Sequence, residues 1–375
     1  MRPKDVKKNL LSHSEAKVNL LSEYLNRYLN IICNDKYTSQ INIYDLFCGE
    51  GIYENGGEGS PIVIMKAVKN VFYKNVARID IKTKINCNFN DLNAAKVAKT
   101  EKSIYQRKLY YPEFGTIKFT SEDYKEYLIE LTKKLNSLNA KSQEKYFVFI
   151  DPYEYKHIKI SHIVELISNQ KTEVLLWLPT QFMYRFEKNG TPTALKDFIE
   201  ELRPFEHWNT SKNVWNFINE LKDSFQKIIG DNFFVDNFTI QKDNNTVFCL
   251  FFFTSHIKGF EKMLESKWKI DSEQGKGWHY TINEPSLFED EKTNPLAEKL
   301  ELYLKQKERT NGDIYVFTVR NGFLPKHTTE VLTYLQKYDK IAVFLQDGKI
   351  ARMRSFYISY RNYKNEYSKV TIKPK

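Results

Sequence analysis

The spacing of apolar side chains predicts a long helix followed by alternating strands and helices. From Ser12 onward, apolar residues recur every three or four positions, which predicts an amphipathic helix, and Ser12 and Glu15 have the spacing of a capping box. Short apolar runs separated by helical stretches follow. The predicted strands are 41–47, 85–89, 116–119, 146–150 and 174–178. This alternation indicates crossover units and a mainly parallel sheet.

A pair of antiparallel strands is predicted to close this sheet. The apolar runs 233–240 and 246–253 flank the polar turn Lys242-Asp243-Asn244-Asn245. Five parallel strands followed by such a hairpin describe an α/β, Rossmann-like sheet of the class I methyltransferase type. Residues 185–230 are rich in helix formers and predict a helical insertion, either a structural cap or a lid over a substrate site.

A second, smaller domain is predicted after the acidic stretch 289–291. Helical patterns at 295–307 and 325–338 precede a hairpin, in which strands at 341–346 and 349–358 flank the tight turn Asp347-Gly348. Two helices and a two-stranded wing predict a winged-helix-like module. The predicted organisation is an N-terminal helical segment at 1–40, a methyltransferase-like domain at 41–284 and the winged-helix-like domain at 295–375.

Composition is that of a soluble globular protein, with 41% hydrophobic and 28% charged residues among 375. No apolar segment is long enough to span a bilayer, and the charged start Met1-Arg2-Pro3-Lys4 carries no apolar signal core, so a cytoplasmic protein without a membrane partner is expected. The four cysteines lie far apart and form no CxxC pair. We therefore expect reduced thiols and no metal site.

The chain is basic, with a net charge of +10, and its charge is concentrated near the C-terminus. Between 351 and 375, lysines and arginines face a single acid, Glu366, and five aromatic residues interleave with them. Basic residues among aromatic ones favour a nucleic-acid partner, DNA or RNA, through phosphate contacts and base stacking. A solvated basic terminus would show the same composition.

The strongest chemical motif is Asp45-Leu46-Phe47-Cys48-Gly49-Glu50-Gly51, directly after the first strand. Glycines at the carboxyl end of a strand let the backbone approach a ligand closely, at the edge where open α/β sheets bind cofactors. The motif continues with Ile52-Tyr53-Glu54-Asn55, which is acidic and unsuited to phosphate. Acidic residues suit the sulfonium and ammonium groups of S-adenosylmethionine. Asp45, Phe47, Gly49 and Gly51 are therefore candidate cofactor residues; the alternative is a glycine turn without a ligand.

Two further carboxylates follow the next two strands. Asp91 is placed to accept hydrogen bonds from ribose hydroxyls, the role of an acidic residue at this point of nucleotide-binding folds. A helix cap at Asp91 is the alternative. Asp123 is placed to meet the adenine amine or, equally, to cap the following helix.

The fourth strand ends in Asp151-Pro152-Tyr153, which predicts a methyl-acceptor site. The Asp151 carboxylate and the Pro152 carbonyl can orient a target amine, and Tyr153 can stack on a base. Methyl transfer is an in-line displacement, so positioning contributes much of the rate. The alternative is a turn that ends the strand.

Together these motifs resemble the three-Cys-motif partner proteins, a family with methyltransferase-like character. The resemblance rests on His13-x3-Lys17, on the motif from Asp45 to Gly51, on Gly59-Ser60-Pro61 opening a helix, and on 149–153, and it covers nearly the whole chain. It implies a class I fold and a partner carrying a three-cysteine, radical-SAM-like motif that is encoded nearby. Ser60 is a further candidate cofactor residue, lining the loop.

The segment from Asp151 to Lys156 is also similar to the Asp-Pro-Pro-Tyr-Glu motif of ribosomal-RNA adenine-N6 methyltransferases, with one proline absent. Two hypotheses follow. The chain is an S-adenosylmethionine-dependent N-methyltransferase acting on a nucleic-acid base, or it is a non-catalytic subunit of the same fold that binds nucleic acid.

Overall fold

A computed structural model describes residues 11–76, 83–139, 141–152, 158–189, 193–202, 211–279 and 295–375. The described chain divides into two compact units. The first contains the residues up to His256 and those from Lys269 to 279, and the second contains Ile257–Trp268 together with 295–375. None of the described helices is long and apolar enough to cross a membrane.

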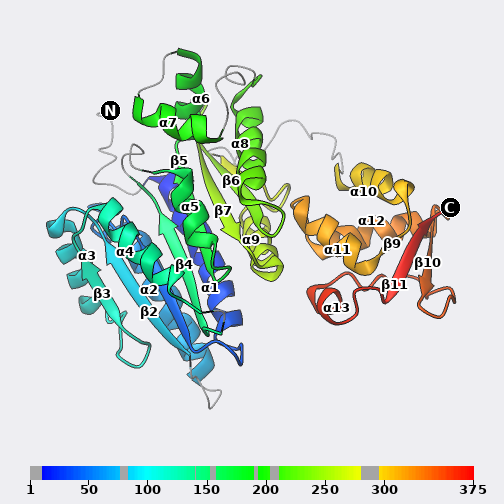
Figure 1. Ribbon diagram of the computed structural model, residues 1–375, viewed down its shortest axis with the longest axis horizontal. Helices are drawn as coiled ribbons and strands as arrows, with labels where there is room; N and C mark the ends of the chain where they lie inside the picture. Colours follow the sequence, from blue (N-terminus) through cyan, green and yellow to red (C-terminus); the bar gives the residue numbers. More distant parts are fainter. Residues whose placement is uncertain are drawn as a thin grey trace. The chain divides into compact units, whose positions relative to one another are not determined.

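The first unit is built on an eight-stranded sheet with the order β3-β2-β1-β4-β5-β7-β6-β8 (Figure 1). β1 pairs in parallel with β2 and β4, while β7 runs antiparallel to both β5 and β6. The strands are β1 (Gln40–Asp45), β2 (Lys84–Asn90), β3 (Ile117–Thr120), β4 (Glu144–Ile150), β5 (Thr172–Leu178), β6 (Phe234–Asp243), β7 (Thr246–Thr254) and β8 (Gly277–His279). This order confirms the predicted class I methyltransferase-type fold. The short β8, parallel to β6, was not predicted.

Helices cover both faces of this sheet. Side chains alternate along β4, so that Tyr146 and Val148 belong to a core shared with α4 and α5, while Phe147 contacts Tyr24 of α1 on the other face. The helices are α1 (Ser12–Ile32), α2 (Ser60–Val76), α3 (Ala94–Gln106), α4 (Tyr124–Asn136), α5 (Ile160–Ile167), α6 (Thr180–Asn189), α7 (Thr193–Leu202) and α8 (Val214–Ile229). The predicted helical insertion is thus formed by α6, α7 and α8.

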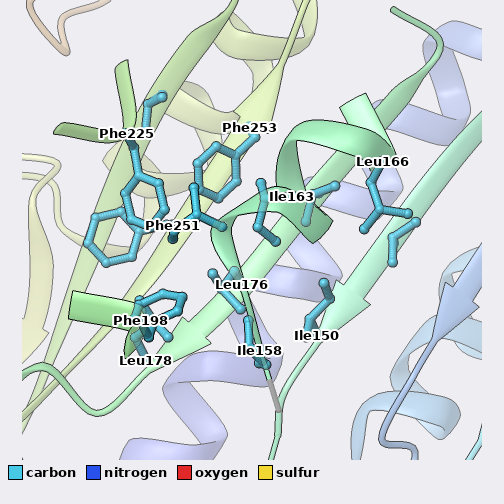
Figure 2. Close-up of a cluster of buried hydrophobic side chains, with 14 of the residues drawn as sticks. Ile150, Ile158, Ile163, Leu166, Leu176, Leu178, Phe198, Phe225, Phe251 and Phe253 are labelled. Carbon is cyan, nitrogen blue, oxygen red and sulfur yellow. The ribbon is translucent and has the colours of Figure 1, made fainter. Parts of the chain in front are cut away.

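Figure 2 shows part of the core on the α4, α5 and α8 side of the sheet. Aliphatic side chains make up most of this core, and three aromatic rings lie close together within it: the ring of Phe225 lies 5.1 Å from that of Phe251 and 5.0 Å from that of Phe253. Strands covered on both faces need nearly continuous apolar sequence, which explains why 174–178 and 246–253 were recognisable as strands.

The start of α1 differs from the prediction. The helix begins at Ser12 as expected, but its N-cap is Leu11, which makes no side-chain capping hydrogen bond. Ser12 is already inside the helix, so the predicted capping box between Ser12 and Glu15 is wrong. The apolar stripe of α1 fixes the helix without it, since Leu20, Leu21, Tyr24 and Leu25 are fully buried.

The second unit is a winged helix. It contains α10 (Pro295–Gln306), β9 (Arg309–Thr310), α11 (Asn311–Arg320), α12 (Pro325–Lys337), β10 (Ile341–Leu345), α13 (Tyr360–Asn365) and β11 (Val370–Pro374). The three strands form an antiparallel sheet with the order β10-β11-β9. Residues 257–268 of α9 (Ile257–Ile270) group with this unit, and Tyr315 of α11 donates a buried hydrogen bond to Glu261 at 2.6 Å.

The prediction of a second wing strand at 349–358 is wrong. The turn at Asp347-Gly348 forms, with Gly348 at φ 81°. Pairing beyond it ends at Ala351: the Leu345 N–H donates to the Lys349 carbonyl and the Ala351 N–H to the Val343 carbonyl, both at 2.8 Å, with a bridge between Phe344 and Ile350. The backbone is left-handed at Arg354 and Tyr357, with φ of 65° and 56°, which no strand accommodates. The strand that pairs with β10 is β11 instead.

Candidate cofactor and acceptor site

Asp45 is the last residue of β1 and is completely buried at the carboxyl end of the strand. Its Oδ1 accepts a hydrogen bond from the Phe47 N–H at 3.3 Å, whereas Oδ2 has no hydrogen-bond partner among the described residues. Burial raises the pKa of Asp45 to about 7, and the charge of Asp151 acts in the same direction. The Ser60 hydroxyl, the Phe47 N–H and the charge of Lys17 oppose the shift. A buried acceptor without a donor is costly, so this oxygen is suited to a cationic ligand.

The glycine turn that follows brings backbone to this edge of the sheet. Gly49 and Gly51 have φ of 64° and 71°, in the left-handed region that glycine accommodates. The Gly51 carbonyl accepts from the Gly59 N–H at 2.7 Å, and a Cβ at Gly51 would lie 3.0 Å from the Thr100 hydroxyl. At Gly49, in contrast, an added Cβ would meet no atom within 4 Å. The turn is therefore closely packed on one side and open at Gly49.

Asp91 lies next to this turn, although it is 42 residues from Gly49 in sequence. Its Oδ2 accepts from the Gly49 N–H at 3.1 Å and its Oδ1 accepts from the Asn93 N–H at 2.9 Å. The helix that follows begins at Ala94 and is capped by Asn93, which accepts hydrogen bonds from the N–H groups of Ala95 and Lys96. Asp91 is therefore not the helix cap, and its carboxylate belongs to the glycine turn.

Asp123 caps α4, accepting from the Lys125 N–H at 2.8 Å. Asn90, buried at the end of β2, fixes the preceding loop: its Oδ1 accepts from the Thr120 hydroxyl and from the Glu122 N–H, and its Nδ2 donates to the Glu122 carbonyl. Of the two interpretations open for Asp123, the geometry shows the cap.

Asp151 follows β4 and forms an ion pair with Lys17 of α1. The side chains of Lys17 and Asp151 are only 11% and 21% exposed, so the pair is largely shielded from water. Pro152 is buried, and Tyr153 lies outside the described residues. Because the charges of Asp151 and Lys17 both act on Asp45, the structure brings the two predicted carboxylates into one site.

Three side chains join the site without having been predicted. Lys17 appeared in the sequence only as part of the His13-x3-Lys17 spacing, which places both residues on one face of a helix. Burial raises the pKa of Tyr53 to about 12, and Asp151, Glu50 and Asp45 add to the shift. The ring of Tyr124 stacks on Phe47 at 5.0 Å, and its buried hydroxyl has no partner in the described structure.

The described residues contain no group of three or more histidine, cysteine, aspartate or glutamate side chains arranged to hold a metal ion. None of the four cysteines takes part in a disulfide. Burial, reinforced by the charges of Asp45 and Asp91, raises the pKa of the Cys48 thiol. Cys48 is thus a neutral part of the turn.

In the second unit, the C-terminal aromatic residues are used internally. The Tyr367 hydroxyl donates to Asp313 at 2.9 Å, and the Tyr363 ring lies 5.2 Å from that of Tyr315. Several of the basic residues are also paired within the unit: Lys369 with Glu366, Lys373 with Glu308 and Lys375 with Asp339.

Four basic residues of this segment remain exposed, with no ion pair to the described part of the chain: Arg352, Arg354, Arg361 and Lys364. The Arg354 N–H donates to Gln336 of α12 at 3.0 Å, so this loop lies beside α12. The exposed residues of α12 are Lys326, Glu330, Tyr334 and Lys337.

Residues 269–348 match the family described as the GMT-like wHTH domain. The comparison with curated proteins finds no match. The family match begins at the last two residues of α9, includes β8, and extends into the second unit as far as Gly348.

Among solved structures, an O-methyltransferase from Bacillus cereus in complex with SAH aligns at 9% identity over 68% of this chain and 93% of that chain, with a TM-score of 0.33. An O-methyltransferase of a trans-AT PKS multienzyme of Brevibacillus brevis, with S-adenosyl-L-homocysteine, aligns at 10% identity over 78% and 96%, with a TM-score of 0.25. A loganic acid methyltransferase with SAH gives 11% over 62% and 78%, with a TM-score of 0.23. These are remote likenesses, and the fold rests on the strand order itself.

Proposed function

We propose that the chain is an S-adenosylmethionine-dependent methyltransferase that acts on a nitrogen of a nucleic-acid base. The observation that carries the cofactor assignment is Asp45 Oδ2, a fully buried carboxylate oxygen at the carboxyl end of β1 that has no hydrogen-bond donor among the residues the structure describes. An ammonium or sulfonium group is the chemistry that would compensate it. A phosphorylated ligand would be repelled there.

The surrounding residues fit such a cofactor. The open backbone at Gly49 lets a ligand approach closely, and Asp91 presents a carboxylate beside it. Asp45, Phe47, Gly49, Gly51, Ser60 and Asp91 would hold the cofactor; Asp123, being engaged as a cap, would have a lesser part. The cofactor supplies an electrophilic methyl group on its sulfonium sulfur. On the acceptor side, Asp151 and the Pro152 carbonyl would orient the target amine and Tyr153 would stack on the base.

Calorimetric titration tests the cofactor assignment. The wild-type chain should bind S-adenosylmethionine, and Asp45→Asn, which keeps the shape of the side chain but removes its charge, should lower the affinity at least tenfold, the equivalent of about 1.4 kcal/mol. Asp339→Asn is the matched control, because it removes the charge of an exposed carboxylate of the second unit. Absence of heat from the wild-type chain at millimolar ligand would exclude the cofactor.

The nucleic-acid part of the proposal is supported by the winged-helix unit. Arg352 and Arg354 are exposed beside α12, whose exposed residues include Lys326 and Lys337. Such a surface suits phosphates, and each phosphate contact contributes about 0.9 to the slope of log affinity against log salt on duplex DNA.

Fluorescence anisotropy on labelled duplex and single-stranded oligonucleotides tests this surface. Arg352→Ala/Arg354→Ala should weaken binding and reduce the magnitude of the duplex salt slope by about 2. Lys102→Ala/Lys118→Ala removes the same charge from exposed positions of the first unit and should leave the slope unchanged. Equal effects of the two double variants would show that only net charge matters.

We also propose that the chain works with a three-Cys-motif protein, on the strength of the sequence resemblance. The Lys17–Asp151 pair favours a second candidate function, a non-catalytic subunit, because it occupies the carboxylate that would orient an amine. A transfer assay with labelled S-adenosylmethionine on cellular DNA and RNA, with and without the neighbouring gene product, distinguishes the two. In the non-catalytic case, Asp151→Asn preserves cellular function while deletion of 295–375 abolishes it.

A further inference from the structure

Within the described part of the chain, Lys17 is the cation that pairs with the predicted acceptor carboxylate, Asp151. Its ammonium has three N–H donors, and among the described residues it makes a single hydrogen bond, to Asp151 Oδ2. The whole residue is only 9% exposed. A nearly buried lysine is costly unless it is paired, so this contact fixes both side chains.

Aromatic rings hold Lys17 in this position. Its Nζ lies 4.8 Å from the centroid of the Trp177 ring, and Trp177 stacks on Phe248 at 4.9 Å. One turn earlier on α1, the His13 ring also stacks on Phe248, with the two ring centroids 5.6 Å apart. Burial lowers the pKa of His13 to about 4, helped by Lys242 and Lys17, so His13 adds no charge near neutral pH.

The site therefore contains two carboxylates, Asp45 and Asp151, and one opposing cation, Lys17. Asp151 raises and Lys17 lowers the pKa of Asp45, which places all three within electrostatic range of one another. Asp45 and Asp151 attract a cation, and Lys17 offsets part of that attraction. Because one Asp151 oxygen is held by Lys17, the other is the one that remains for a substrate group.

We propose that Lys17 is a positioning residue that holds the Asp151 carboxylate and sets how strongly the site prefers a sulfonium over a neutral thioether. This inference rests on the proposed function. The natural probes are S-adenosylmethionine and S-adenosylhomocysteine, which differ by the methyl group and the sulfonium charge. Discrimination between them reports the electrostatics of the acceptor side without requiring a known substrate.

The experiment is a pair of calorimetric titrations, with S-adenosylmethionine and with S-adenosylhomocysteine, on the full-length chain and its variants. Lys17→Met removes the charge while keeping an unbranched apolar stem, and should raise the preference for S-adenosylmethionine about three- to tenfold, the range for removing one partly screened unit charge near the ligand. Lys17→Arg should preserve the wild-type preference. Lys269→Met, which removes an ion pair between Lys269 and Glu23 of α1 (2.6 Å), is the matched control and should also preserve it.

Asp151→Asn supplies a second, opposite readout that does not depend on Lys17→Met folding: it should lower the preference for S-adenosylmethionine. In one outcome, the wild-type chain binds both ligands while Lys17→Met and Asp151→Asn leave the ratio of the two affinities unchanged. That result would overturn the positioning role of Lys17 and leave the cofactor assignment standing. A wild-type chain that binds neither ligand would remove the proposed function and this inference with it.

Discussion

Replacing Asp45 by asparagine should stabilise the ligand-free protein, and the gain should grow with pH. The pKa of Asp45 is raised by burial from 3.8 to about 7, so the folded state resists ionisation of a group that the unfolded chain ionises freely. Between about pH 4 and pH 7 the wild-type protein therefore loses stability as pH rises. At 1.36 kcal/mol per pKa unit, the loss reaches about 4 kcal/mol above pH 7 and is about 1.5 kcal/mol at pH 5.

Thermal unfolding of wild type, Asp45→Asn and Asp123→Asn at pH 5 and pH 8 measures this difference. One kcal/mol corresponds to about 2–4 °C for a unit of this size, so Asp45→Asn should raise Tm by roughly 10 °C at pH 8 and by about a third of that at pH 5. Asp123→Asn should change Tm little at either pH. An Asp45→Asn gain that is equal at both pH values, or a loss, would refute the argument that ionised Asp45 strains the fold.

Stability measurements test three other sites. Burial raises the pKa of Glu173 to about 7, so Glu173→Gln should gain about 2–3 kcal/mol more above pH 7 than below pH 5. Asn311 is buried and bonds two backbone groups, at 3.0 and 3.2 Å, so Asn311→Ala should cost the second unit about 2–4 kcal/mol, seen as faster amide exchange there. Gly115 has φ 147°, and a Cβ there would overlap a backbone carbonyl, so Gly115→Ala should lower the free energy of unfolding by about 2–4 kcal/mol. Gly348→Ala is the comparison: its Cβ would meet open space, so it should cost only about 1 kcal/mol.

The sequence predicts the central strands well because they are buried on both faces. Such strands contain runs of apolar residues, as at 174–178, and this signal survives without any knowledge of neighbours. The errors lie where the pattern is weak or non-local. β8 has three residues, and α11 has no clear apolar stripe, since Asn311 and Thr318 lie on its buried side.

The wing shows a different kind of limit. Both 349–358 and 370–374 contain alternating apolar residues, and only tertiary pairing decides which one joins β10. The left-handed backbone at Arg354 and Tyr357 leaves no local signal in those residue types. The sequence also favours the C-terminal aromatic residues as groups that stack on bases. In the structure Tyr367 instead donates a hydrogen bond to Asp313, and the Tyr363 ring packs against that of Tyr315.

For the site, the sequence supplied the strand-end carboxylates but not their partners. Asp45, Asp91 and Asp151 could be found because each follows an apolar run, where parallel strands place their carboxyl ends together. Lys17 could not, because its contact with Asp151 joins residues 134 positions apart. A helix face carrying His13 and Lys17 was the only available signal.

A comparison of Glu173 with Asp45 shows how differently two buried carboxylates of this sheet are hydrogen-bonded. Both carboxylates are buried in the same sheet, and burial raises the pKa of each to about 7. Glu173 lies at the amino end of β5, where it accepts hydrogen bonds from the hydroxyls of Tyr24 and, at 2.8 Å, Thr254, so each of its oxygens has a donor within the protein. Asp45 lies at the opposite end of its strand with one oxygen unpaired. Unlike Glu173, Asp45 therefore keeps one oxygen with no hydrogen-bond donor among the described residues, and this difference supports the proposal that a cationic ligand supplies the missing partner.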